Sequence, residues 1–201
     1  MMSINCSIRL ARSQDAAELL EIFRPYVLET AVAFNYEPPT LDEFRNTMED
    51  RLRRYPYLVA ETEEGLMGYA YASPFKARAA YDWAVETSVY VRQDQRKMGT
   101  GRALYHALED VLRMQNILNV NACIAYQEGE DETLTHDSVL FHRRMGYRLV
   151  GEFFQCGYKF GRWYNMVWME KHLGPHPDHP ADVAPFPRIR AQAEAWLNAG
   201  R

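Results

Sequence analysis

The stretch from Glu86 to Gly101 contains residues whose types and spacing could do chemistry. Val89 and Val91 lie on an expected strand that runs into a polar turn, and Gly99 and Gly101 open an expected helix. Backbone N–H groups at a helix start lack partners and carry partial positive charge, so they bind phosphate oxygens well. Three side chains add positive charge nearby: Arg96, Lys97 and Arg102.

Three kinds of phosphate-binding loop compete for this segment. A P-loop needs Gly-Lys followed by Ser or Thr, which the sequence lacks here. A dinucleotide fingerprint needs a third glycine three residues after Gly101, where the chain has Leu104. The remaining pattern is Arg-x-x-Gly-x-Gly, formed by Arg96, Gly99 and Gly101. A lone Gly-x-Gly would also fit a simple strand-to-helix turn that binds no phosphate, which is the alternative interpretation of this segment.

Strands and helices that could position this loop alternate along the chain. Period-two segments predict strands over 7–11, 57–61, 66–72, 83–91, 120–125, 147–156 and 163–169. Helical spacing predicts helices over about 15–27, 40–52, 100–112 and 138–144, with a last turn or two within 189–197. Thr40 and Glu43 form a capping-box pattern. The order predicts an α/β (α+β) fold, a mixed sheet of about six to seven strands with helices on both faces.

Length and composition narrow the function classes. The chain has 201 residues, a net charge of -4 and a pI near 5.9, unlike the basic surface of a nucleic-acid binder. Neither a signal-peptide pattern nor an apolar stretch of about 20 residues is present, so we expect no membrane contact and a cytoplasmic location. Three scattered cysteines fit free thiols: Cys6, Cys123 and Cys156. The histidines of the tail could bind metal by composition alone, and we expect no metal.

Several motifs together resemble one family of enzymes. The loop of Arg96, Gly99 and Gly101 after Val-Tyr-Val is similar to the coenzyme A loop of the GNAT acetyltransferase superfamily. The run 75–83 followed by Val85-Glu86 resembles its phosphinothricin N-acetyltransferase branch. So do Leu140-Phe141-His142 before Met145-Gly146-Tyr147, and Gly157-Tyr158-Lys159 before Trp163. The resemblance implies a GNAT N-acetyltransferase domain over 7–173, followed by a proline-rich strap with a short helix over 174–201.

The resemblance also implies roles for individual residues. Acetyl-CoA, the expected co-substrate, would be bound by Val89, Val91, Arg96, Lys97, Met98, Gly99, Thr100, Gly101, Arg102 and Ser138. The family often has Asn three residues before the helix serine, where this chain has Thr135. Glu86 would accept the proton of the attacking amine and His142 would donate or relay one to the thiolate. The alternatives are a carboxylate paired with Arg78 and a packed histidine.

The expected acceptor is the amino group of a small amino acid-like molecule of the phosphinothricin or methionine sulfone/sulfoximine type. Arg78 would bind its acid group with two hydrogen bonds, Tyr81 would position it, and Phe34 would cover its aliphatic part or pack in the core. Attack would be direct, in a ternary complex. Two rival functions remain, a protein or peptide N-acetyltransferase and a catalytically silent coenzyme-binding module. Aromatic late strands and the tail could join subunits into a homodimer.

Overall fold

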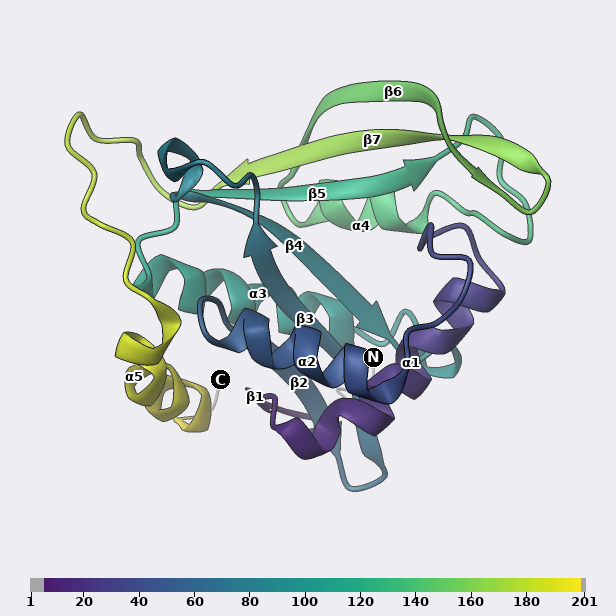
Figure 1. The fold of residues 1–201 in the computed structure, drawn as a ribbon. Helices are drawn as coiled ribbons and strands as arrows, with labels where there is room; N and C mark the ends of the chain where they lie inside the picture. The colour runs from purple at the N-terminus through teal and green to yellow at the C-terminus, as the bar shows by residue number, and fades with distance from the viewer. Residues whose placement is uncertain (1–5, 200–201) are drawn as a thin grey trace.

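A single mixed sheet of seven strands organises the molecule, with strand order β1-β2-β3-β4-β5-β7-β6 (Figure 1). The structure is a computed structural model and describes residues 6–199. All neighbouring strands pair antiparallel except β4 and β5, which pair parallel. The strands are β1 (Ser7–Leu10), β2 (Tyr57–Thr62), β3 (Gly65–Pro74), β4 (Ala84–Val91), β5 (Asn119–Tyr126), β6 (Arg148–Lys159) and β7 (Arg162–His172). The predicted mixed sheet of an α/β (α+β) fold is confirmed.

Helices cover both faces of the sheet, as the sequence predicts (Figure 1). The helices are α1 (Ala16–Leu28), α2 (Leu41–Leu52), α3 (Thr100–Met114), α4 (Asp137–Arg144) and α5 (Phe186–Asn198), with 3-10 turns η1 (Ser13–Asp15), η2 (Ala79–Tyr81) and η3 (Gln93–Gln95). The capping box at α2 is confirmed: the Thr40 side chain accepts from the backbone N of Glu43, and the Glu43 carboxylate accepts from the backbone N of Thr40. None of the described helices is long and apolar enough to cross a membrane.

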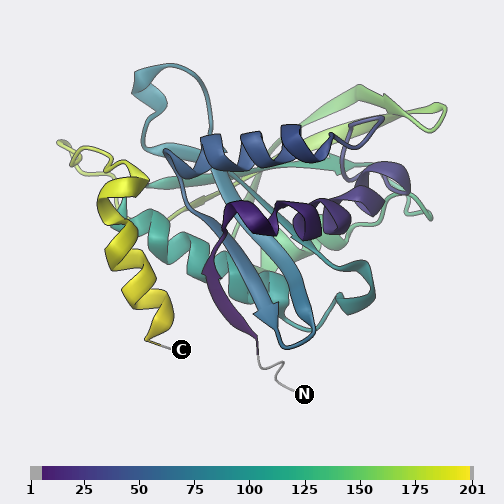
Figure 2. The ribbon, with the colours of Figure 1, turned by 60° about the horizontal axis from the view of Figure 1, so that its bottom comes forward.

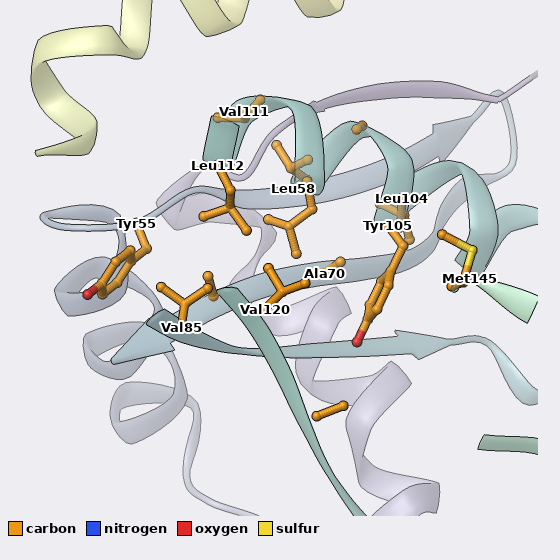
Figure 3. Close-up of a cluster of buried hydrophobic side chains, with 14 of the residues drawn as sticks. Tyr55, Leu58, Ala70, Val85, Leu104, Tyr105, Val111, Leu112, Val120 and Met145 are labelled. Atoms are coloured by element: carbon orange, nitrogen blue, oxygen red, sulfur yellow. The ribbon is translucent and has the colours of Figure 1, made fainter. Parts of the chain in front are cut away.

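Two apolar layers hold the sheet between its helices. On one face α1 and α2 bury a cluster that includes Leu19, Met48, Tyr57 and Tyr69. On the other face α3 buries its apolar side against the sheet, and Figure 3 shows Leu104, Tyr105, Val111 and Leu112 among these side chains. Since alternate residues of a strand point to opposite faces, each central strand contributes to both layers. The sheet is therefore fixed from two sides, and its strand ends are rigid supports for side chains.

The chain after β7 ends in a longer helix than the sequence predicts. Instead of a turn or two within 189–197, α5 spans thirteen residues from Phe186 to Asn198. Its residues Phe186, Ile189 and Ala193 are buried in the same core as α3, and Figure 2 shows α5 lying alongside α3. The tertiary contact explains the extra length, because apolar packing stabilises helices whose sequence alone is a weak signal.

Candidate functional site

The parallel strands β4 and β5 pair over a short stretch and then diverge. Their register pairs end at Glu86 with Asn121, whereas β4 continues to Val91 and β5 to Tyr126. Figure 1 shows the two strands separating beyond that point. Over Val89 and Val91 the β4 edge therefore faces an opening instead of a neighbouring strand. An extended ligand with amide groups could pair with such an edge, as a strand would.

The predicted phosphate loop connects the open end of β4 to α3. Gly99 has φ +94°, a left-handed conformation that favours glycine, and it caps the helix. The first turn bond of α3 runs from Ala103 N to Gly99 O at 3.0 Å. The backbone N–H groups of Thr100, Gly101 and Arg102 precede that bond and belong to the unsatisfied first turn of a helix. The structure thus places anion-binding donors at the mouth of the opening.

The cations of the loop partly face a carboxylate of α4. Arg96 Nη2 and Lys97 Nζ each lie 3.7 Å from Asp137 Oδ2. Met98 and Arg102 are exposed, and the buried hydroxyl of Thr100 lacks a hydrogen-bond partner. A phosphate group entering here would meet the helix N–H groups. Arg96 and Lys97 could then pair with the phosphate instead of with Asp137.

Space around Gly101 is sufficient for a small side chain. A Cβ there would lie 3.6 Å from Phe141 Cε2 and 3.6 Å from Val91 Cγ2, which is ordinary van der Waals contact. The protein itself therefore does not require glycine at this position. A ligand that approaches the backbone closely would require it.

Glu86 stands at the point where β4 and β5 separate. It is opposite Ser73 of β3 and Asn121 of β5, and its side chain is partly buried. Burial raises the pKa of this carboxyl, while the positive charges of Lys76 and Arg51 oppose the rise. A carboxylate with a raised pKa is a better proton acceptor than an exposed one.

His142 is buried on α4 and bonded at both ring nitrogens. Its Nδ1 lies 2.7 Å from the Ser138 carbonyl oxygen, and its Nε2 lies 2.9 Å from the Tyr105 hydroxyl. Burial lowers the pKa of His142 to about 4, so the ring is neutral at pH 7 and carries one proton. The carbonyl needs a donor, so Nδ1 holds that proton and Nε2 accepts from Tyr105. We predict that His142 donates or relays a proton, and a neutral ring that accepts from Tyr105 fits a relay better than a donor.

The two remaining contacts around α4 clarify the start of that helix. The Ser138 carbonyl accepts a hydrogen bond from His142 Nδ1, and Ser138 itself is partly buried. Thr135 stands where the family often has Asn, and its hydroxyl accepts from the backbone N of Asp137 at 3.4 Å. Thr135 therefore helps to order the turn before α4.

A cavity of about 810 Å³ opens on the face of the sheet that carries Glu86. Ala84 and Asn121 line it. Ala84 lies two residues before Glu86 on β4, and Asn121 is the β5 residue that pairs with Glu86. The loop between β3 and β4 contributes Lys76 and Tyr81 to this lining. Arg78 lies in the same loop, exposed and outside the lining.

Lys76 lies over two aromatic rings of this cavity. Its Nζ is 5.0 Å from the Phe75 ring centre and 5.4 Å from that of Trp168. Such a cation–π position holds the ammonium in place and leaves it free to bind an anion. Lys76 is also the first of the two cations that oppose the raised pKa of Glu86.

Phe34 lies in the loop between α1 and α2 and approaches the late strands. A Cβ on Gly157 would lie 2.3 Å from its ring, and its ring centre is 6.2 Å from that of Tyr164. This loop is fixed by Lys159, whose Nζ donates to the carbonyl oxygens of Val27, Thr30 and Ala33 at 2.7, 2.9 and 2.6 Å. Phe34 keeps 37% of its surface exposed, so it packs on β6 and still presents a ring edge.

Sequence reasoning missed Lys76, which lines the cavity, and three side chains that interact with residues of the predicted site or with the elements around it. Lys76 and Lys159 stand in motifs that support the family resemblance, but no local pattern shows that they contact aromatic rings and backbone carbonyls. Tyr105 has helical spacing and reads as core, although its hydroxyl meets His142. Arg51 lies on α2, with its guanidinium 3.9 Å from the Tyr71 ring centre. Only a map of long-range contacts could identify these side chains.

Comparisons with known proteins show the family of this chain. The family model described as "Acetyltransferase (GNAT) domain" matches residues 8–168. The chain is 37% identical over 184 residues to a phosphinothricin N-acetyltransferase of Streptomyces viridochromogenes, covering 90% of this chain and 95% of that protein. It is 34% identical over 179 residues to an L-methionine sulfoximine/L-methionine sulfone acetyltransferase of Pseudomonas aeruginosa, covering 88% of this chain and 100% of that protein.

A solved structure shares the fold. The GNAT superfamily phosphinothricin acetyltransferase from Sinorhizobium meliloti in complex with acetyl-CoA has a TM-score of 0.81 and 31% identity. The match covers 92% of this chain and 97% of that one. A solved relative with this similarity therefore holds acetyl-CoA on the same architecture.

Proposed function

Because the chain belongs to the GNAT acetyltransferase family, we propose that it moves the acetyl group of acetyl-CoA to the amino group of a small amino acid-like acceptor. The observation that carries the proposal is the half-buried Glu86 at the divergence of β4 and β5. Its strand leads to an anion-binding helix start, and its neighbours Ala84 and Asn121 line a cavity that also contains Lys76, several aromatic side chains and the carboxylates Glu152 and Glu170. Phosphinothricin and methionine sulfone or sulfoximine are the acceptor types that the relatives' names suggest.

Acetyl-CoA would occupy the open edge of β4 and the start of α3. The N–H groups of residues 99–102 would bind the pyrophosphate, with Arg96, Lys97 and Arg102 adding charge. The amides of the pantetheine arm would pair with the β4 edge at Val89 and Val91. Ser138, at the start of α4, would contact the coenzyme on the far side of the opening, and Met98 would cover it.

The reaction would then proceed by direct attack in a ternary complex. The acceptor amine loses a proton to Glu86, directly or through water, and its nitrogen attacks the acetyl carbonyl. The C–S bond breaks and coenzyme A leaves as a thiolate, which regains a proton. The thiolate would take that proton from solvent, and His142, whose Nε2 accepts a hydrogen bond from the Tyr105 hydroxyl, would hold Tyr105 in position. Attack and departure need no covalent enzyme intermediate.

The acid group of the acceptor would be bound from the loop between β3 and β4. Glu86 is an anion, so a second carboxylate nearby needs a cation. Arg78 offers a planar fork from this loop, and Lys76 lines the cavity itself. Tyr81, also in the lining, would add a hydrogen bond, and Phe34 would cover the aliphatic part.

An acceptor series that pairs each amino acid with its uncharged amide tests this proposal. Thiol release from acetyl-CoA and the mass of the N-acetylated product are measured for both members of each pair. We expect the acids to be preferred, and Lys76→Met or Arg78→Met to remove that preference while the Michaelis constant for acetyl-CoA stays unchanged. Absence of N-acetylated product with every small amine, or transfer only to peptides, would contradict the proposal and favour the rival functions.

We further propose that the enzyme works in the cytoplasm. Its three cysteines are free thiols in the structure, which fits a reducing compartment. Mass spectrometry of the protein isolated under thiol-trapping conditions checks this: all three thiols should be recovered reduced.

A further inference from the structure

The segment between β7 and α5, residues 174–185, is attached to the body of the protein along its length; we call it the strap. The Trp83 indole N–H donates to the Ala181 carbonyl at 2.8 Å, and the Asn116 amide donates to the Asp182 carbonyl at 2.8 Å. The buried Gln115 amide donates to the Ala184 carbonyl at 2.7 Å. Gln115 and Asn116 directly follow α3, and Trp83 lies in the loop before β4. The strap is therefore held by segments next to elements that also build the site.

Both ends of the strap are fixed as well. Before it, Leu173 N donates to the Leu118 carbonyl at 2.7 Å. After it, α5 buries Phe186 and Ala193 in the core beside α3, and Figure 1 shows the strap running from β7 down to α5. A segment with several prolines and two fixed ends has little freedom to move, so it can act as a wall.

The strap forms one side of the 810 Å³ cavity. His176, Pro177 and Pro180 line it, together with Tyr81 and Trp83 of the loop before β4. His176 Nε2 lies 2.6 Å from Asn119 Oδ1, an acceptor, so Nε2 is the donor of this bond. In the neutral ring Nδ1 then keeps a lone pair that can accept a hydrogen bond.

The position of His176 relative to Glu86 sets what it can touch. Asn119 pairs with Ala84 in the register of β4 and β5, and Asn121 pairs with Glu86 two residues farther on. Two residues along a strand span about 7 Å. An acceptor whose amine lies at Glu86 would therefore direct a side chain of about four or five bonds toward the strap.

We propose that the strap is the acceptor-selectivity wall of this enzyme, with His176 meeting the far end of the acceptor side chain. The inference rests on the proposed function and deepens it. The strap lies beyond residues 8–168 that the family model matches. Beside aromatic and proline walls, the cavity is lined by the Lys76 cation, the carboxylates Glu152 and Glu170, Asn119 and His176. Glu152 accepts from Asn165 and Glu170 pairs with Arg148, so His176 is left to meet an uncharged hydrogen-bonding group at the end of a short apolar side chain.

A length series of acceptors tests the wall directly. Straight-chain 2-amino acids of increasing length are titrated by calorimetry in the presence of coenzyme A, and their acetylation is followed in parallel. In His176→Ala, longer members should gain about fourfold in affinity for each methylene that the enlarged cavity newly buries. The shortest members and acetyl-CoA should bind as in the parent.

Two further variants separate the wall from general effects. His179→Ala changes an exposed histidine of the same strap outside the lining and should leave the length profile unchanged. Asn116→Gly keeps the positive φ of 66° accessible and removes the bond to Asp182, so it should broaden the profile without touching the cavity. Turnover by the parent tests the proposed function, whereas the length profile tests the wall. A profile that is the same in the parent, His176→Ala and Asn116→Gly would overturn the proposal, even if all three acetylate amino acids.

Discussion

His142 is a buried histidine whose neutral state follows from its partners. Its Nδ1–H donates to the Ser138 carbonyl, and its Nε2 accepts a hydrogen bond from the Tyr105 hydroxyl. A ring held this way orients Tyr105 toward the sheet, in the direction that Figure 3 shows for its hydroxyl. It supports the coenzyme end of the site and adds a pH dependence to stability.

Acid should destabilise the fold through His142. Its pKa falls from an ordinary 6.5 to about 4 on folding, so the unfolded chain binds a proton between these values and the native protein does not. Stability from this group is complete above about pH 6.5 and is lost as pH falls toward 4, by an amount on the order of 3 kcal/mol. Unfolding temperature measured against pH checks this. His142→Phe should show a flatter decline than the parent in that window, and identical slopes would contradict the assigned protonation state.

Gly101 should matter for coenzyme binding and little for folding. Gly101→Val adds a branched side chain where the backbone would meet the pyrophosphate, while a Cβ at this position would lie at ordinary contact distance from the nearest protein atoms. Calorimetry should show acetyl-CoA affinity reduced by tenfold or more, with Gly101→Ala intermediate. Thermal unfolding should change by only a few degrees. Unchanged affinity in Gly101→Val would remove the loop from the coenzyme site.

Among single residues, the sequence predicts those whose role depends on the local backbone conformation. Gly99 and Gly101 were identifiable because a strand, a turn and a helix start are neighbours in the chain, and Glu86 precedes them on the same strand. Lys76, Arg51 and Tyr105 were not, because their importance depends on which face of the sheet they share with Glu86 or His142. That information lies in contacts between distant segments.

The loop between α1 and α2 is the element whose order depends most on a single side chain. Lys159 on β6 uses all three N–H bonds of its ammonium on carbonyls of Val27, Thr30 and Ala33. A lysine that is 2% exposed is rare unless its donors are satisfied. This contact connects the Phe34 loop to the late strands and so shapes the acceptor side of the site.

Loss of that contact should affect the acceptor and spare the coenzyme. Lys159→Met keeps the length of the chain but leaves three carbonyl oxygens without a donor, which costs about 1–3 kcal/mol of stability. We expect the Michaelis constant for the acceptor to rise severalfold and that for acetyl-CoA to stay the same. Lys171→Met, which breaks the pair with the buried Glu109 on α3, is a control that lowers stability elsewhere. An equal kinetic effect of both variants would show that Lys159 acts through stability alone.

Elements with strong periodicity or caps were predicted closely, and α5 was not. Thr40 and Glu43 mark α2 within the sequence itself, and the spacing of Leu104, Leu108 and Val111 marks α3. The length of α5 follows from docking of Phe186 and Ala193 on a core made by other segments. The full length of a helix that depends on such contacts cannot be predicted from its own sequence.

The whole molecule leaves the edge strand β6 with large apolar side chains in solvent. Phe153 is 55% exposed and Phe154 72%, and Trp163 on the adjacent β7 is 58% exposed. Exposed aromatics on a sheet edge favour association with another chain. We propose a homodimer that covers this surface, in line with the expectation from the aromatic late strands.

Light scattering after size exclusion checks the assembly. The parent should have twice the mass of the 23.4 kDa chain, and Phe154→Lys should shift it to the monomer. Leu28→Lys changes another exposed apolar residue, on α1, and should leave the mass unchanged. A parent that is monomeric at every concentration would contradict the proposed dimer.

The pH dependence of acetyl transfer in Glu86→Gln tests the central claim most directly. Glutamine keeps the size of the side chain and removes the proton acceptor, so kcat/KM for the acceptor at neutral pH should fall by a factor on the order of 10² or more. The deficit should shrink as pH rises and more of the amine is already neutral. The parent profile should show an acidic limb above the ordinary pKa of a glutamate, because burial raises the pKa of Glu86, and the variant should lack it. Parallel profiles for parent and variant would contradict the assignment of Glu86 as the base, and with it the site proposed for this reaction.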